Sequence, residues 1–210
     1  MNAGKISMVV GSLLLLNAAA AFAEDKPAPA KAAPAKAEAA KPDAAKPDAG
    51  KPMGPPPVPK EMDELKSFLG EWKCTGEATG PDGKTHKVTT ENSIKADLGG
   101  YWQHVKHHEL KSKDNPVEFV AEGWWGYDAT AKTFTGLFAG TYGAWETRTS
   151  KGWEGDTLVW SGDLHGFMGA PKTPFKHSFT RKGDKEAGEK FEVQIAGKWV
   201  PLQDNVCKKK

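Results

Sequence analysis

Three of the six histidines fall within one short segment, at His104, His107 and His108. Histidine is the commonest metal ligand and a frequent general base near neutral pH. On a β-strand, His104 and His108 would share a face but lie about 13 Å apart, at roughly 3.3 Å per residue. One zinc ion binds nitrogen at about 2 Å, so it cannot take both. We therefore predict a solvated, weakly basic strand and no metal site, since a metal site here would need a further ligand from another strand, such as His86 or His177.

His177 is the more promising side chain, because Phe175 and Phe179 share its face if this segment is a strand. When that face lines the interior of a barrel, polar and aromatic side chains from other strands join it. An apolar cavity with a few convergent polar groups is typical of a small-molecule site. The candidate ligand-binding residues are His177, Phe175, Phe179, His86, Thr90, Asn92, Tyr101, Gln103, His107, Trp125 and Tyr127. The alternative is a filled barrel in which these groups satisfy one another or bind water.

The sequence carries none of the common signatures of catalysis. It has no G-x-S-x-G elbow, no phosphate-binding loop and no H-E-x-x-H zinc motif. No pair of carboxylates is marked out by its spacing, and the two cysteines do not form a C-x-x-C redox motif. We therefore predict no catalytic residue and no cofactor. An enzyme of unknown reaction stays open as the third choice, behind two kinds of binding protein.

The elements that would position these residues are β-strands. Between residues 86 and 98, small, apolar and uncharged polar residues alternate with a mostly charged set, as in a half-buried antiparallel strand. The first set is His86, Val88, Thr90, Asn92, Ile94, Ala96 and Leu98. Similar alternation recurs over residues 118–127, 133–140, 158–164 and 191–195, with Gly-, Asp- and Pro-rich turns between the runs. About nine or ten strands joined in this way predict an antiparallel barrel, which removes its edges by closing.

A short helix is predicted ahead of the strands. Met62, Leu65 and Phe68 share one helical face, and Gly70 is a suitable stop. All eight tryptophans lie after residue 60, so the barrel domain is expected to span residues 61–210. Its charge is close to neutral, since the excess lysines lie nearer the N-terminus, and this argues against nucleic-acid binding.

Residues 1–23 are typical of a cleavable secretory signal. Lys5 precedes an apolar stretch, and Ala21-Phe22-Ala23 is a small-x-small cleavage pattern. The alternative, an N-terminal membrane anchor, is disfavoured by the short apolar segment. No later stretch approaches the roughly 20 apolar residues of a membrane helix. We expect a periplasmic or secreted protein, cleaved near Ala23, with no integral membrane span in the mature chain.

Residues 24–60 are expected to form a disordered linker. They consist largely of Ala, Pro, Lys and Asp, with nothing aromatic to bury, so they cannot offset the entropy of ordering.

Cys74 and Cys207 lie near the two ends of the domain that follows. The first and last strands of a closed barrel are neighbours, and an oxidising compartment permits a disulfide between them. Such a bridge would lock the closure of the barrel.

The helix followed by Leu69-Gly70-Glu71-Trp72 resembles the opening of lipocalin-like (calycin) barrels. The match is closer to a bacterial group of exported proteins, domain of unknown function 1579. The further motifs are Leu98-Gly99-Gly100, Gly123 with Gly126-Tyr127-Asp128, and Phe179-Thr180-Arg181-Lys182, so the resemblance spans about residues 61–183. It implies a lipocalin-like barrel without an established activity or cofactor. It also implies structural roles for Trp72, at the closed end of the barrel, and for Arg181 as the basic residue that covers it.

The sequence thus favours an exported all-β barrel that binds a small apolar or amphipathic ligand in its interior. The alternative is a non-catalytic module of the cell envelope, tethered by its linker and binding an envelope partner through its surface.

Overall fold

The computed structural model describes residues 54–80, 83–166 and 172–210. The predicted signal peptide and most of the predicted linker, residues 24–53, lie outside these ranges. Residues 54–59 have no helix or strand, and the first element begins at Lys60. Within the described ranges, no helix is long and apolar enough to cross a membrane.

The described chain is almost entirely strands. The strands are β1 (Gly70–Thr79), β2 (Thr85–Asp97), β3 (Trp102–Glu109), β4 (Phe119–Asp128), β5 (Thr133–Gly140), β6 (Trp145–Ser150), β7 (Trp153–Glu154), β8 (Thr157–His165), β9 (Thr173–Gly183), β10 (Glu186–Ile195) and β11 (Lys198–Lys209). The three short 3₁₀ helices are η1 (Lys60–Phe68), η2 (Leu98–Gly100) and η3 (Thr141–Gly143).

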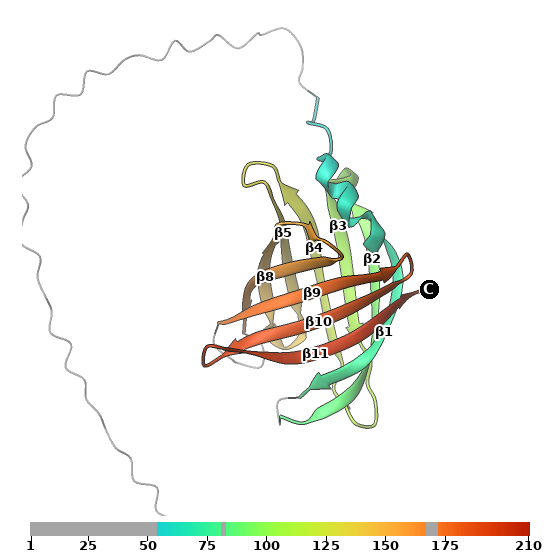
Figure 1. The fold of residues 1–210 in the computed structure, drawn as a ribbon, viewed down its shortest axis with the longest axis vertical. Coiled ribbons are helices and arrows are strands. Elements are labelled where there is room, and N and C mark those ends of the chain that lie inside the picture. The colour runs from blue at the N-terminus through green and yellow to red at the C-terminus, as the bar shows by residue number, and fades with distance from the viewer. Residues whose placement is uncertain (1–53, 81–82, 167–171) are drawn as a thin grey trace, which may run out of the picture. The chain divides into compact units, whose positions relative to one another are not determined.

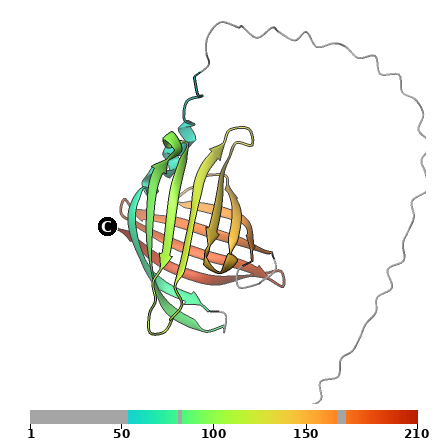
Figure 2. The same ribbon diagram turned by 180° about the vertical axis from the view of Figure 1, so that it is seen from behind.

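Ten of these strands form a closed antiparallel barrel. Each long strand pairs with its neighbour in the sequence, except at two places that complete the circle. One is the pairing of β1 with β11, and the other is the pairing of β6 with β8, while the two-residue β7 adds only to β8. In Figure 1, β8 to β11 run across the direction of β2 to β5, and the reverse view in Figure 2 brings the green-to-yellow strands to the front. The predicted all-β antiparallel barrel with a short N-terminal helix is confirmed.

The helix η1 covers one end of the barrel. Met62, Leu65 and Phe68, the predicted apolar face, are all buried. Phe68 makes ring contacts with Trp125 and other aromatic side chains of the barrel, at 5.5 Å between centroids for this pair. The chain then turns into β1 at Gly70, whose φ of 123° favours glycine. Aromatic packing therefore closes the end of the barrel that η1 covers.

The alternation of faces predicts the strands well and fails where strands end. Leu98 was expected on the buried face of β2, but its side chain is 62% exposed. The strand ends at Asp97, whose side-chain oxygen accepts a hydrogen bond from the Leu98 amide at 2.7 Å, and Leu98 has a φ of 46°. Ile195 is likewise 55% exposed, because it ends β10 beside the turn at Ala196. The side-chain period of two holds only while the backbone stays extended.

Candidate functional site

A cluster of charged and polar side chains occupies the middle of the barrel. We call it the central cluster, and it consists of Glu146 and Arg148 from β6, His177 from β9, Glu189 from β10 and Asn205 from β11. Four of these residues are buried, and the side chain of His177 is 15% exposed. Strand β6 lies on one side of β8, and β9, β10 and β11 follow on the other, so the pairing of β6 with β8 that closes the barrel brings all five residues together.

The hydrogen bonds of the central cluster fix the tautomer of His177. Arg148 contacts Glu146 through Nη2, and its Nη1 lies 3.1 Å from His177 Nδ1. Guanidinium nitrogens only donate, so His177 Nδ1 accepts and its hydrogen resides on Nε2. That Nε2–H then donates to Glu189 Oε1 at 2.9 Å, and Asn205 Nδ2 donates to Glu189 Oε2 at 3.0 Å. His177 is therefore neutral.

The electrostatics of the central cluster agree with this assignment. Burial lowers the pKa of His177 and outweighs its bond to Glu189. Burial alone would raise the pKa of Glu189, but the hydrogen bonds from His177 and Asn205 lower it below its usual value. Burial lowers the pKa of Arg148 to about 9, which leaves it cationic at neutral pH. The Arg148 guanidinium also lies 4.5 Å from the centre of the Phe138 ring, a cation–π contact.

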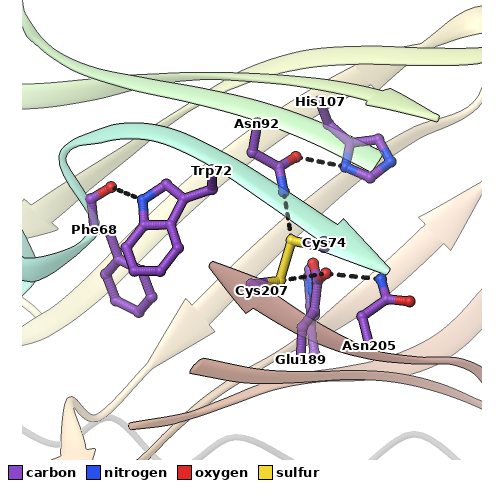
Figure 3. The surroundings of a disulfide bond; sticks show 9 residues. Phe68, Trp72, Cys74, Asn92, His107, Glu189, Asn205 and Cys207 are labelled. Atoms are coloured by element: carbon purple, nitrogen blue, oxygen red, sulfur yellow. Dashed lines mark hydrogen bonds and ion pairs between the residues drawn. A yellow bond between two sulfur atoms is a disulfide. The ribbon is translucent and has the colours of Figure 1, made fainter. Parts of the chain in front are cut away.

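A disulfide lies directly against this cluster (Figure 3). Cys74 of β1 and Cys207 of β11 are paired, and Cys207 Sγ lies 3.4 Å from Glu189 Oε2. On the other side, Asn92 donates its amide to Cys74 Sγ at 3.4 Å. The Asn92 carbonyl lies 2.8 Å from His107 Nδ1, which must carry the hydrogen, and burial lowers the pKa of His107 to about 4. The disulfide is thus bordered by a carboxylate on one side and by an amide and a neutral imidazole on the other.

Several buried polar atoms of the described residues have no hydrogen-bond partner. They are His86 Nε2, Thr90 Oγ1, Gln103 Oε1, Trp125 Nε1, Arg148 Nε, Trp160 Nε1, Gln203 Nε2 and Asn205 Oδ1. Four of them belong to the wall formed by β11, β1 and β2. We call His86, Gln203, Asn205 and Thr90 the polar track.

The polar track follows three successive rows of this wall. The first row pairs Gln203 with Ala78 and Ala78 with His86. The second joins Asn205, Gly76 and Val88, and the third joins Cys207, Cys74 and Thr90. The track therefore runs from the end of the barrel away from η1 to the disulfide.

Two hollows lie near the ends of this track, one at His86 and the other beside the disulfide. A recess of about 610 Å³ is lined by Glu77, Lys84, Thr85, His86, Lys87 and Asp114. A cavity of about 20 Å³ is lined by Phe68, Trp72, Cys74, Asn92, Ile94, Phe179, Ala187 and Cys207. The cavity has room for about one water molecule. His86 belongs to both the recess and the polar track, so the recess lies at the outer end of the track.

The structure brings together most of the predicted ligand-binding residues. His177, Phe175, Thr90, Asn92 and His107 lie in the middle of the barrel, and His86 lies at its open end. Trp125, Phe179, Gln103 and Tyr127 lie nearer η1, where aromatic packing surrounds them.

Tyr101 lies apart from the other candidates. Its hydroxyl donates to the Pro56 carbonyl, outside the interior. It precedes β3 and has helical φ and ψ of −71° and −20°, so the alternation of that strand does not extend to it.

Four residues of the central cluster were missed by reasoning from the sequence. Glu189 shares its strand face with Phe191 and Val193, so its inward direction was visible in the alternation. Glu146 and Arg148 were harder to find, because their outward neighbour Trp145, 45% exposed, suggests the opposite face. A strand with charges inside and an aromatic residue outside inverts the usual pattern.

Trp72 and Arg181 contribute to packing, although they do not contact as expected. Trp72 is buried and donates its Nε1 hydrogen to the Phe68 carbonyl at 2.7 Å. Lys209 Nζ lies over its ring at 5.5 Å, while the Arg181 guanidinium lies 3.5 Å over the ring of Trp153. The basic residue that covers Trp72 is thus Lys209.

Comparison with protein families gives a match over residues 59–204 to the family described as "Protein of unknown function (DUF1579)". Among solved structures, the chain is similar to Rv2717c from M. tuberculosis, with a TM-score of 0.59 and 13% identity. The alignment covers 73% of this chain and 99% of that one. At this identity the likeness concerns the fold alone. No curated protein matches the sequence significantly.

Proposed function

The chain belongs to the DUF1579 family, and we propose that it is a binding protein that holds a small amphipathic ligand along the polar track. The observation that carries this proposal is the alignment of unpartnered buried atoms on one wall of the barrel, leading from the recess to the central cluster. Each unpartnered buried donor or acceptor costs about 1–3 kcal/mol unless water or a ligand pairs with it. A ligand with several hydrogen-bonding groups would remove that cost.

The sizes of the two hollows decide how such a ligand would lie. The recess, at about 610 Å³, falls within the range of ordinary small-molecule sites. The inner cavity, at about 20 Å³, admits no more than a water molecule. We therefore place a polar end of the ligand in the recess, whose lining is polar and charged, with the rest reaching inward past His86 toward Asn205 and Thr90.

Aromatic side chains of β9 and β10 supply the apolar part of the proposed site. Phe175 is buried, and its ring stacks on Phe191 at 5.3 Å between centroids. Phe191 pairs with Gln203 across β10 and β11, so this stack borders the first row of the polar track. An amphipathic ligand would therefore meet aromatic surface on one side and unpartnered donors and acceptors on the other.

Native mass spectrometry of the protein isolated from its own source tests this proposal. We expect a bound species of small-molecule mass that is released when the protein is unfolded. A ligand-free mass from gently handled material, together with ordered water on every atom of the polar track, would contradict it.

We also propose that the chain acts outside the cytoplasm. The signal-like pattern of residues 1–23 supports this, as does a disulfide inside the folded domain. Mass spectrometry of the native protein should find an N-terminus near Glu24.

Deletion of residues 25–59 separates ligand binding from the alternative of a tethered module of the envelope. A ligand carrier keeps its bound species after this deletion, whereas a tethered module loses its location or its partner.

A further inference from the structure

We propose that reduction of the Cys74–Cys207 disulfide creates a buried site for a thiophilic divalent cation such as Zn²⁺. The ligands are the two cysteine sulfurs and the carboxylate of Glu189. Their potential ligand atoms all lie within 4.8 Å of one another, and all three residues are buried. This site differs from the ligand site proposed above and does not depend on it.

The chemistry and the space around the disulfide both suit such an ion. Zinc binds thiolate at about 2.3 Å and carboxylate oxygen at about 2.1 Å, in tetrahedral geometry. Tetrahedral angles then place the two sulfurs on the order of 4 Å apart. The cavity of about 20 Å³ is lined by both cysteines, so it gives the sulfurs room to separate once their bond is broken.

The neighbouring polar groups already orient the ligands. Glu189 is held through both oxygens, by His177 at 2.9 Å and by Asn205 at 3.0 Å. The Asn92 amide points at Cys74 Sγ, and His107 fixes that amide through its carbonyl (Figure 3). Metal sites commonly have such an outer shell of hydrogen bonds, which fixes the direction of each ligand. Here such hydrogen bonds hold Glu189 and reach Cys74.

The local charge favours a cation once the sulfurs are reduced. Two thiolates beside the Glu189 carboxylate would place several negative charges in a buried space, which is costly without compensation. Arg148, the cation of the central cluster, contacts Glu146 and His177 rather than the sulfurs. A divalent ion bound by all three ligands supplies the missing positive charge.

The reaction balances with a dithiol as the reductant. The dithiol gives two electrons and two protons to the disulfide, and it becomes a disulfide itself. The S–S bond between Cys74 and Cys207 breaks, and two thiols form. The metal ion then binds both sulfurs and displaces their two protons to solvent.

Cobalt binding to the mature chain, residues 24–210, tests the proposal. The protein is reduced with a phosphine, which is then removed under anaerobic conditions, and Co²⁺ is titrated while thiolate-to-cobalt absorption is followed. We expect one equivalent of Co²⁺ to bind, with Zn²⁺ displacing it. The unreduced protein and the Cys74→Ser/Cys207→Ser double variant should show no such absorption.

Two single variants test the role of Glu189. Glu189→Gln should weaken Co²⁺ binding by on the order of 10-fold or more. The matched control is Glu192→Gln, because Glu192 lies on the same strand and pairs with Lys190 instead. This control should leave the affinity unchanged.

Three results would overturn the proposal. The first is reduced protein with two titratable thiols and no thiolate-to-cobalt absorption. The second is unchanged affinity in Glu189→Gln. The third is a reduced chain that loses its near-ultraviolet circular dichroism and does not recover it on addition of Co²⁺.

Discussion

At the scale of single residues, the hydrogen-bond donors and acceptors of the central cluster determine how its side chains are oriented. Arg148 forces His177 to accept at Nδ1, and this directs the His177 Nε2 hydrogen to Glu189. Glu189 therefore serves two buried donors at once, since Asn205 occupies its other oxygen. A carboxylate in this position is costly to bury and costly to remove, because its loss strands both donors.

Replacing Glu189 with leucine should accordingly destabilise the protein strongly. The His177 and Asn205 hydrogens would lose their acceptor, and each stranded donor costs about 1–3 kcal/mol. We expect the free energy of unfolding in urea to fall by about 2–5 kcal/mol. Glu192→Leu is the control, and its change should stay within about 0.5 kcal/mol. A Glu189→Leu protein as stable as the wild type would contradict the hydrogen-bond assignment.

Acid should weaken the fold through His107. Its folded pKa is lowered from 6.5 to about 4 by burial, so the unfolded chain takes up this proton first as the pH falls. The contribution of His107 to stability is therefore constant above pH 6.5 and decreases between pH 6.5 and about 4, by on the order of 3 kcal/mol.

Urea unfolding at several pH values tests this dependence with matched variants. His107→Gln should flatten the decrease over that window. His104→Gln, on the outward face of the same strand, should leave it intact. An equally steep decrease in His107→Gln would show that another group carries it.

At the scale of elements, the contact between β1 and β11 depends on a glycine. A Cβ on Gly76 would lie 2.0 Å from the Asp204 carbonyl oxygen and 2.5 Å from Asn205 Oδ1. These strands close the barrel, and β1 lies between the β11 and β2 residues of the polar track, so their spacing controls both the fold and the proposed site.

Gly76→Ala should therefore push β1 and β11 apart and lower the free energy of unfolding by about 3 kcal/mol. Gly188→Ala is the matched control, because its Cβ would meet the flexible end of Lys182 at 3.4 Å and Thr180 Cβ at 3.9 Å, both ordinary contacts. The expected change there is close to zero. Equal melting temperatures for the two variants would contradict the close approach at Gly76.

The strands were predictable from the sequence because one face of each is buried, which produces an alternation of side chains. The same rule predicts that His177, Thr90 and His107 face inward. It failed at Leu98 and Tyr101, where the backbone leaves the extended conformation. It also failed at Glu146 and Arg148, because charged residues face inward there: Arg148 pairs with Glu146 on the same strand and contacts His177 of β9 across the closed barrel. Pairing between distant strands is not encoded in the period of any one strand.

At the scale of the whole molecule, the disulfide joins the two strands whose meeting closes the barrel. It links residues 133 positions apart, so it removes much of the freedom of the unfolded chain. The chain-entropy treatment gives about 5 kcal/mol for a loop of this length, and measured values are often smaller. Reduction should lower the free energy of unfolding in urea by about 3–5 kcal/mol, with the Cys74→Ser/Cys207→Ser variant insensitive to reductant. No shift on reduction would mean that closure does not depend on the bridge.

The central claim is that the polar track binds a ligand, and two adjacent threonines test it most directly. Thr90 is fully buried with an unpartnered hydroxyl, while Thr89 lies next to it on the outer side of β2. Native mass spectrometry of both valine variants, isolated from the natural source, measures the bound species that each retains. Thr90→Val should lose most of that species and Thr89→Val should keep it. Equal retention by both variants, or a bound species in neither variant nor the wild type, would contradict the claim.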